Sequence, residues 1–214
     1  MADITQVTYL FDPLCGWCYG ASAKLEQLAA QPDVALRLVP TGLFAGAGGR
    51  LMDAEFAAFV WANDQRIGKL SGQPFSEDYR RKVLDDRTGR INSGPATLAL
   101  TAVSITAPDR EFEALKAIQK ARYVEGRDIT DISVLSEILR GLGLGAAAER
   151  LVASDAELVS ANQKRTADAN ADMRKFGANG VPNLIVGAGD KRRLVAGGVL
   201  FESLETLVEE LKAA

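Results

Sequence analysis

The sequence predicts an α/β fold in which mixed segments at the two ends of the chain flank an all-helical middle. Two observations carry this prediction. Strand patterns occur near both ends of the 214 residues, and helical spacing dominates the region between them. The length suffices for one large domain or two small ones. We therefore expect one domain from residues 1–45 and 161–214, with an inserted helical domain over residues 46–160.

The N-terminal segment has the pattern of a βαβ unit. Residues 7–11 are β-branched or aromatic and stop at Asp12-Pro13, which indicates a buried strand. Good helix formers fill residues 21–30. Hydrophobic residues then alternate with others over residues 34–38, before Pro40, as in a second strand. Residues 12–20 therefore lie at the first strand-to-helix turn.

The middle segment carries the spacing of successive helices. Apolar residues recur at helical intervals near residues 56–67, 96–103, 115–121 and 132–139, and Phe59 is assigned to the first of these stripes. The spacing from Ser154 to Glu157 is that of a capping box, which predicts a further helix start. Charged residues here are assigned to solvated faces. With no comparable strand pattern, we expect this segment to be entirely helical.

The C-terminal segment returns to mixed structure. A polar helix containing Met173 and Phe176 is expected to end at Gly177. Two short strands over residues 183–186 and 194–196 are separated by a turn at 187–190. An amphipathic stripe completes the chain: Leu204, Leu207, Val208 and Leu211. The ends of the chain thus predict β-α-β followed by α-β-β-α.

Composition excludes several classes of function. The chain has no histidine, so Ser-His-Asp, Cys-His and His-metal chemistry are not available to it. The 25 basic and 28 acidic residues give a net charge of −3, which offers no basic surface for nucleic acid. No apolar run has the roughly 20 residues of a membrane span. We expect neither nucleic acid nor membrane as a partner.

The N-terminus indicates the cellular compartment. Residues 1–6 lack a basic region and lead directly into the first predicted strand, unlike a signal peptide. We therefore expect a cytoplasmic protein, or a periplasmic one if a signal peptide had been removed.

The two cysteines form a single C-x-x-C motif, Cys15-Gly16-Trp17-Cys18, at the predicted strand-to-helix turn. Unpaired N–H groups and the helix dipole stabilise a thiolate at such a position, so Cys15 is the candidate nucleophile. Cys18 can then resolve a mixed disulfide or close an internal one. Gly16 permits a tight turn, and Trp17 offers an apolar face near the opening.

The cysteine pair and a glycine-rich stretch each have other interpretations. Structural zinc needs four ligands, of which two cysteines supply only half. Two inert cysteines or a structural disulfide are further alternatives to a redox pair. Residues 143–148 match the loosest form of a dinucleotide fingerprint, but they follow a helical pattern where the fingerprint needs a strand. We interpret them as a helix C-cap and linker, and expect no cofactor and no metal.

The stretch from Tyr9 to Gly20, the helical block and the later Gly180-Val181-Pro182 resemble the DsbA-like branch of the thioredoxin superfamily. The similarity is greatest to FrnE-type proteins and predicted bacterial protein-disulfide isomerases. It implies a thioredoxin-like fold with an inserted helical domain, with Cys15 attacking and Cys18 resolving. It also implies that Val181-Pro182 is a cis-proline loop facing the cysteines and binding substrate together with Gly16 and Trp17.

This chain departs from the family pattern at the active site. Gly-Trp replaces the Pro-His of strongly oxidising members, so a strong oxidase is not expected. Tyr9 stands where many relatives carry a buried acid, which leaves Asp12 as the nearest carboxylate and candidate proton acceptor. Gly before an aromatic residue resembles isomerases, whereas Val before the proline resembles oxidases.

The resemblance implies a thiol–disulfide oxidoreductase, of the reductase or isomerase kind, acting on protein or peptide disulfides. Apolar residues of the helical domain would help to shape the substrate groove, and glutathione is a candidate electron partner. Two alternatives stay open: a kappa-type glutathione transferase or isomerase acting on a small molecule, and a non-catalytic peptide-binding module. Either a monomer or a homodimer is compatible with the sequence.

Overall fold

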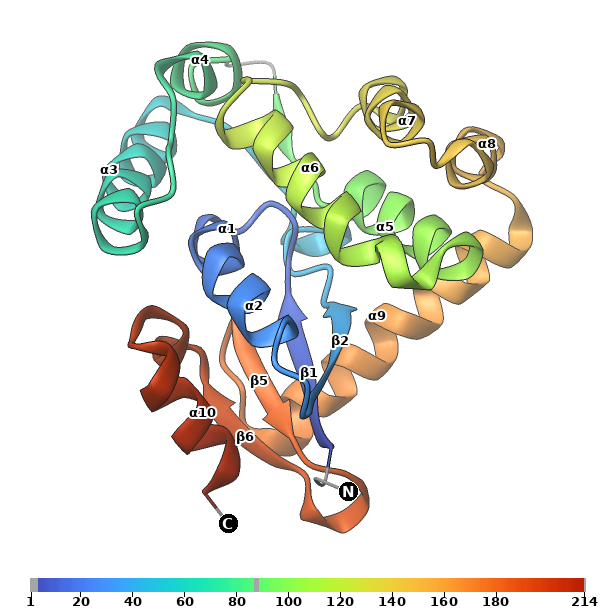
Figure 1. Ribbon diagram of the computed structural model, residues 1–214. Coiled ribbons are helices and arrows are strands. Elements are labelled where there is room, and N and C mark those ends of the chain that lie inside the picture. Colours follow the sequence, from blue (N-terminus) through green and yellow to red (C-terminus); the bar gives the residue numbers. More distant parts are fainter. Residues whose placement is uncertain (1–3, 87–88, 214) are drawn as a thin grey trace.

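A four-stranded sheet with the strand order β2-β1-β5-β6 forms the centre of the computed structural model, which describes residues 4–86 and 89–213 (Figure 1). Strands β1 (Thr5–Phe11) and β2 (Val34–Pro40) are parallel. Strands β5 (Asn183–Val186) and β6 (Arg193–Ala196) form an antiparallel hairpin, and β5 pairs antiparallel with β1. The predicted α/β class is confirmed, as is the succession of these four strands along the chain.

Alternation along β1 divides the core between the two faces of the sheet. Val7, Tyr9 and Phe11 are buried on the face that packs against α2 (Ser22–Ala29) and α10 (Leu204–Lys212). Leu10 points to the other face, where Ala169 of α9 (Ala156–Phe176) covers it. The sheet is therefore enclosed by helices on both sides (Figure 1).

The middle of the chain forms a helical segment at the end of the sheet where β1 and β2 finish (Figure 1). Its helices are α3 (Ala54–Ser71), α4 (Glu77–Tyr79) with a π-helical turn over Arg80–Leu84, α5 (Gly94–Thr106), α6 (Glu111–Tyr123), α7 (Ile132–Gly141) and α8 (Gly145–Ala153). Short 3-10 helices cover Gly46–Gly48, Pro108–Arg110, Gly189–Lys191 and Gly197–Phe201. The four predicted helices are confirmed.

The prediction of a purely helical insert is wrong in one respect. Strands β3 (Arg50–Leu51) and β4 (Arg90–Ile91) pair antiparallel within it. Two-residue strands are too short to show an alternating pattern, so the sequence carries no sign of them. Phe59 also departs from its assigned apolar stripe, because 62% of its surface is exposed.

Three helix boundaries differ from the prediction. The first helix begins earlier than residue 21, with α1 (Gly16–Gly20) leading into α2. The supposed linker after Gly143 is instead the start of α8. Asp155, not Ser154, caps α9, because its side chain accepts a hydrogen bond from the Leu158 N–H and Ser154 has the left-handed conformation.

Helix α9 joins the helical segment to the sheet without interruption. It runs through residues 160 and 161, so the predicted domain boundary falls inside a helix. Arg165 fixes this helix by donating to the carbonyl of Leu38 at 3.0 Å and to the Glu111 carboxylate at 2.7 Å. One side chain thereby links α9 to both β2 and α6.

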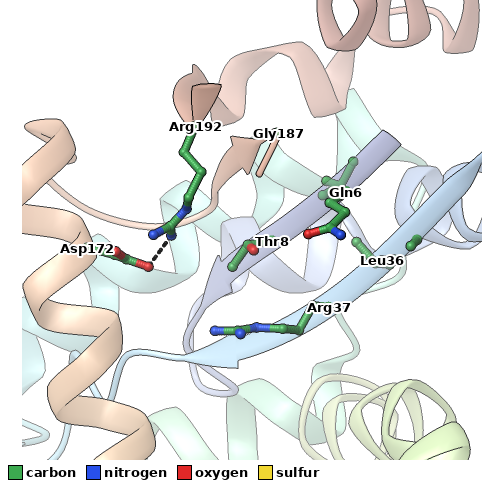
Figure 2. Close-up of a pocket in the computed structure, with 9 residues that line it drawn as sticks. Gln6, Thr8, Leu36, Arg37, Asp172, Gly187 and Arg192 are labelled. Atoms are coloured by element: carbon green, nitrogen blue, oxygen red, sulfur yellow. Dashed lines mark hydrogen bonds and ion pairs between the residues drawn. The ribbon is translucent and has the colours of Figure 1, made fainter. Parts of the chain in front are cut away.

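A surface cavity of about 410 Å³ lies near the beginning of β1, on the face covered by α9 (Figure 2). Gln6, Thr8 and Arg37 line it, and an ion pair between Arg192 and Asp172 closes one side. Neither cysteine borders this cavity. Within the described residues, no helix has both the length and the apolar character needed to cross a membrane.

Candidate active site

The loop after β1 is held in place by the carboxylate of Asp12. This side chain is fully buried and accepts hydrogen bonds from the Leu14 N–H at 2.9 Å, the Phe44 N–H at 3.1 Å and the Ser93 hydroxyl at 2.7 Å. Burial raises the pKa of Asp12, although these hydrogen bonds oppose the shift. With its oxygens bound to the surrounding loops, Asp12 braces the active-site turn.

Cys15 occupies the N-cap of α1, as the sequence predicts. Its backbone is extended, and its carbonyl accepts the Tyr19 N–H at 3.0 Å. The Cys15 sulfur lies 3.6 Å from the carbonyl oxygen of Val181, and the residue as a whole is 7% exposed. Cys15 is therefore buried, but less deeply than Cys18, and it lies between the first helical turn and the residue 181 loop.

The loop facing Cys15 contains a cis peptide bond between Val181 and Pro182, as predicted. Asn183 holds this loop from behind. Its side-chain amide donates to the Gly180 carbonyl at 2.8 Å, while its side-chain oxygen accepts the Gly197 N–H at 2.9 Å. Sequence reasoning missed this role, because Asn183 precedes a hydrophobic strand and its partner Gly197 is distant in the chain.

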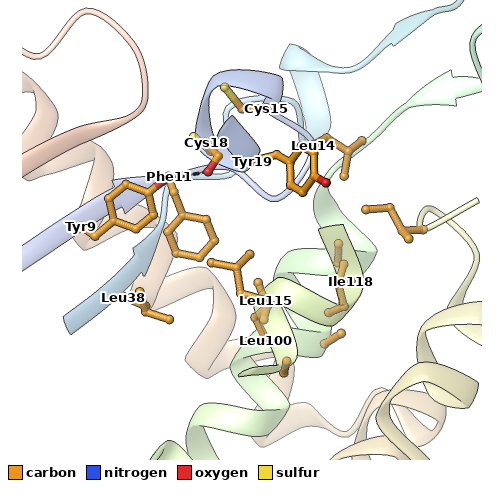
Figure 3. Close-up of a cluster of buried hydrophobic side chains, with 14 of the residues drawn as sticks. Tyr9, Phe11, Leu14, Cys15, Cys18, Tyr19, Leu38, Leu100, Leu115 and Ile118 are labelled. Carbon is orange, nitrogen blue, oxygen red and sulfur yellow. Dashed lines mark hydrogen bonds between the residues drawn. The ribbon is translucent and has the colours of Figure 1, made fainter. Parts of the chain in front are cut away.

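Cys18 lies deeper than Cys15 and is 1% exposed. Both cysteines are free thiols (Figure 3). Burial raises the pKa of Cys18 well above its usual range, and a hydrogen bond with Cys15 adds to the shift. The hydroxyl of Tyr9 donates to the Cys18 carbonyl at 3.3 Å. Cys18 is thus a neutral thiol in the resting protein, and the neighbouring Tyr9 is neutral as well.

Trp17 packs beside the cysteines as part of a small aromatic pair. Its ring meets the ring of Phe201 edge-on at 5.2 Å, and the guanidinium of Arg66 lies 6.0 Å from the Trp17 ring. Trp17 is half-buried, so one part of it remains available beside Cys15. Phe201 and Arg66 were not predicted, because both are far from Trp17 in the sequence.

A buried polar cluster closes the other side of the first helical turn. It consists of Asp64, Tyr79, Arg122 and Tyr123, which we call the Asp64 cluster. Asp64 and Arg122 are each only 3% exposed, so the prediction that charged residues of the helical segment lie on solvated faces is wrong for both. Burial raises the pKa of Asp64 to about 7, against the hydrogen bond from Tyr79 and the charge of Arg122.

Among the described residues, no group of three or more His, Cys, Asp or Glu side chains could hold a metal ion. Gly143 adopts the left-handed conformation that ends α7, and Gly145 begins α8, so the glycine-rich motif there serves the turn between two helices.

The predicted site residues therefore converge at one place. Cys15 lies against the Val181 carbonyl in the loop of the cis Pro182, the half-buried Trp17 follows two residues later in α1, and Cys18 lies deeper than Cys15. Gly16 faces inward instead: a side chain at this position would collide with Asp64 Oδ1 and press on Ile67. This geometry supports thiol–disulfide exchange in which Cys15, the less deeply buried cysteine, reacts first and Cys18 reacts second.

Comparisons with known proteins agree with this geometry. The family profile for the DSBA-like thioredoxin domain matches residues 6–212. The cytosolic disulfide reductase DsbM from Pseudomonas aeruginosa is 32% identical with a TM-score of 0.84, covering 98% of this chain and 100% of that one. Its structure with GSH is 32% identical with a TM-score of 0.81, covering 97% and 100%.

A protein from Nitrosomonas europaea shares the fold at 23% identity and a TM-score of 0.81, covering 98% of this chain and 96% of that one. A sequence search of curated proteins gives no significant match. The profile match over nearly the whole chain decides the family. This chain belongs to the DSBA-like thioredoxin family of thiol–disulfide oxidoreductases.

Proposed function

We propose that this protein is a cytoplasmic disulfide reductase that uses Cys15 and Cys18 to reduce disulfides of proteins or peptides. The observation that carries the proposal is the position of Cys15 at a helix N-cap, 3.6 Å from the Val181 carbonyl. Of the two buried cysteines, Cys15 is the less deeply buried, so a substrate disulfide would meet its sulfur first, and Cys18 would react second. The similarity to DsbM, described as a cytosolic disulfide reductase, supports both the direction and the compartment.

The proposed reaction begins at Cys15. Its thiolate attacks one sulfur of the substrate disulfide, forms a mixed disulfide and releases the other substrate sulfur as a thiolate. Cys18 then loses its proton and attacks the Cys15 sulfur, which releases the second substrate thiol and leaves a Cys15–Cys18 disulfide. Two glutathione thiols supply the two electrons that restore the dithiol, and one glutathione disulfide leaves. The structure of DsbM with GSH supports glutathione as this donor.

The reducing direction follows from the stability of the reduced form. A dithiol protein is a strong oxidant when its reduced form is specially stabilised. This chain has no histidine to place beside Cys15, and Gly16-Trp17 occupies the dipeptide position. The backbone carbonyl of Val181, although near the sulfur, is not a charge that would stabilise a thiolate. We therefore expect a potential closer to that of thioredoxin than to that of a strong oxidase.

We assign the surface around Cys15 to substrate binding. Trp17, Val181 and Pro182 would contact the chain on either side of the attacked disulfide, with Gly16 keeping the turn narrow. All three contact residues are half-buried, as an apolar binding surface requires. Residues 1–45 and 161–214 would supply this catalytic half of the protein, and residues 46–160 would cover it.

Single-cysteine variants test the proposal. With glutathione as donor, the wild type should reduce a mixed or peptide disulfide, and Cys15→Ser should abolish this activity. Cys18→Ser should instead accumulate a mixed disulfide at Cys15, detectable by mass. The two variants serve as controls for each other because each replaces one cysteine sulfur by oxygen. Full turnover by Cys15→Ser, or turnover by wild type without any mixed disulfide in Cys18→Ser, would contradict the proposed function.

A further inference from the structure

The Asp64 cluster lies against the first turn of the helix that carries the cysteines. Asp64 belongs to α3, Tyr79 to α4, and Arg122 and Tyr123 to α6, so the cluster unites three helices of the helical segment. The Tyr79 hydroxyl donates to Asp64 Oδ2 at 2.9 Å. The guanidinium carbon of Arg122 lies 5.4 Å from the Tyr79 ring and 5.7 Å from the Tyr123 ring. None of these contacts is used by the exchange reaction described above.

Asp64 is the member of the cluster that touches the active-site turn. Its other carboxylate oxygen, Oδ1, occupies the space in which a side chain of residue 16 would begin. A side chain at position 16 would therefore displace this carboxylate, and the residue that precedes Gly16 is the candidate nucleophile Cys15. A charge on Asp64 is held beside the same N-terminal turn that is expected to stabilise a thiolate.

The cluster also contacts Leu14, the residue before Cys15. The Tyr123 hydroxyl donates to the carbonyl of Leu14 at 2.8 Å, on the residue before Cys15. Burial raises the pKa of Tyr123 well above its usual range; charges on Tyr79, Asp64 and Cys15 add to the shift, and the charge of Arg122 opposes it. The groups that face Asp64 are therefore Tyr79 from α4, Arg122 and Tyr123 from α6, and the backbone of Gly16, the residue after Cys15, in α1.

We propose that the carboxylate of Asp64, seated against Gly16, opposes a thiolate at Cys15 and thereby makes the reduced protein a stronger electron donor. This inference rests on the proposed reductase function and adds the residue that biases its direction. Asp64 acts through the electrostatics of the turn, so it is a positioning residue and not a catalytic one. The positive charge of Arg122 offsets part of the negative charge of Asp64. The Arg122 guanidinium also lies against the rings of Tyr79 and Tyr123.

The sign of the effect follows from charge repulsion. An anionic Asp64 raises the free energy of a Cys15 thiolate and leaves the uncharged disulfide unaffected, so it shifts the equilibrium toward the disulfide. A protonated Asp64 exerts no such effect. Burial raises the pKa of this carboxyl to about 7, so its charge changes within the physiological range. The bias should therefore grow as the pH rises through 7.

Asp64→Asn tests the proposal because it keeps the shape of the side chain and removes the charge. The equilibrium between dithiol and disulfide is measured in glutathione buffers at pH 5.5 and pH 8. At pH 8 the variant should shift roughly tenfold toward the dithiol, equivalent to about 30 mV. At pH 5.5, where the wild-type carboxyl is mostly protonated, the two proteins should agree within twofold. Asp109→Asn, an exposed aspartate on a distant turn, is the matched control and should resemble wild type.

Tyr79→Phe supplies a second, independent test. It retains the carboxyl but removes the hydrogen bond that favours its charged form. The variant should resemble Asp64→Asn at pH 7 and return to wild-type behaviour by pH 9. This variant decides the question if Asp64→Asn fails to fold.

Two results would overturn the inference: an Asp64→Asn equilibrium equal to wild type at pH 8, or a shift of the same size at both pH values, which a structural change would produce. Both leave the proposed function intact, because wild type would still exchange with glutathione. Absence of any reversible dithiol–disulfide couple in wild type would instead contradict the proposed function itself.

Discussion

The two sides of the Cys15–Cys18 turn differ in their chemistry. Toward the sheet, the inner cysteine rests on Tyr9, whose ring stacks on Phe11 at 5.3 Å. Toward the helical segment, the turn meets the carboxylate of Asp64, backed by the buried guanidinium of Arg122. Tyr9 and Cys18 on the sheet side are neutral at physiological pH, whereas Asp64 and Arg122 on the helical side carry or change charge there.

This difference suggests a division of labour within the fold. The sheet and its loops place the reacting atoms: β1 leads to Cys15, and the residue 181 loop faces it. In our proposal the helical segment supplies the charge of Asp64, which acts on Cys15. A buried charge acts more strongly than an exposed one. Relatives with the same sheet and a different helical segment should therefore share the exchange reaction while differing in its direction.

The largest effect we expect is a dependence of folding stability on pH that comes from Asp64 alone. Its folded-state pKa, about 7, exceeds the ordinary value of 3.8, so the folded protein binds the proton more tightly than the unfolded chain does. The contribution is complete below about pH 4 and is lost as the pH rises through 7. About 1.36 kcal/mol per pH unit over this interval gives roughly 4 kcal/mol.

Urea unfolding at pH 4.5 and pH 8 measures this dependence. Asp64→Asn should lose less stability than wild type over the interval, whereas Asp109→Asn should follow wild type. If the curves of wild type and Asp64→Asn ran parallel, the helical side would carry no titrating charge and the contrast between the two sides would disappear.

Arg122→Met tests the helical side by removing its positive charge instead of the negative charge of Asp64. It removes the buried positive charge and leaves Asp64 without it, which is expected to cost about 3 kcal/mol of unfolding free energy. The loss should be greater at pH 8 than at pH 5, because protonation of Asp64 relieves it. Lys120→Met, an exposed residue on the same helix, is the control. An equal loss at both pH values would mean that Arg122 contributes packing alone.

Gly16→Ala probes the contact between the two sides. A methyl group there meets Asp64 Oδ1 and Ile67, and such overpacking typically costs about 2 kcal/mol. Gly145→Ala is the matched control, because no atom lies within 4 Å of a side chain added there. Adding Asp64→Ala to Gly16→Ala should cost less than the sum of the single variants. Full additivity in thermal or urea unfolding would contradict the contact.

Tyr9→Phe should have the smallest effect. The change removes the hydroxyl that donates to the Cys18 carbonyl at 3.3 Å, at a cost of about 1 kcal/mol. Burial raises the pKa of Tyr9 well above its usual range, so the loss should be the same at pH 5 and pH 8. A loss that changed between those pH values would show that the sheet side also holds a titrating group.

The elements that the sequence predicted share a strong local pattern. Five of the seven residues of β1 are β-branched or aromatic, and α10 has buried leucines at positions 207 and 211, so each element is recognisable alone. Helix α9 was predicted in two pieces because only Leu158 and Ala169 are buried along it. Because α9 lies on the surface of both the sheet and the helical segment, its sequence has little apolar periodicity to detect.

The candidate site divides in the same way. Cys15, Cys18 and Pro182 could be predicted because short motifs mark them. Asp64 could not, because its position in α3 resembles that of any polar residue on a surface helix. Its significance depends on contacts with Gly16 and Tyr79, which only the folded chain brings together. Buried charges that depend on tertiary contacts leave no periodic signal in the sequence.

The reduction potential of the Cys15–Cys18 pair tests the central claim most directly. Wild-type protein is equilibrated in glutathione buffers of graded composition, thiols are trapped by alkylation, and the dithiol fraction is counted by mass. Our account predicts a reversible two-electron couple near that of thioredoxin, about −270 mV. A value near about −120 mV, that of a strong oxidase, or no reversible couple at all, would contradict it.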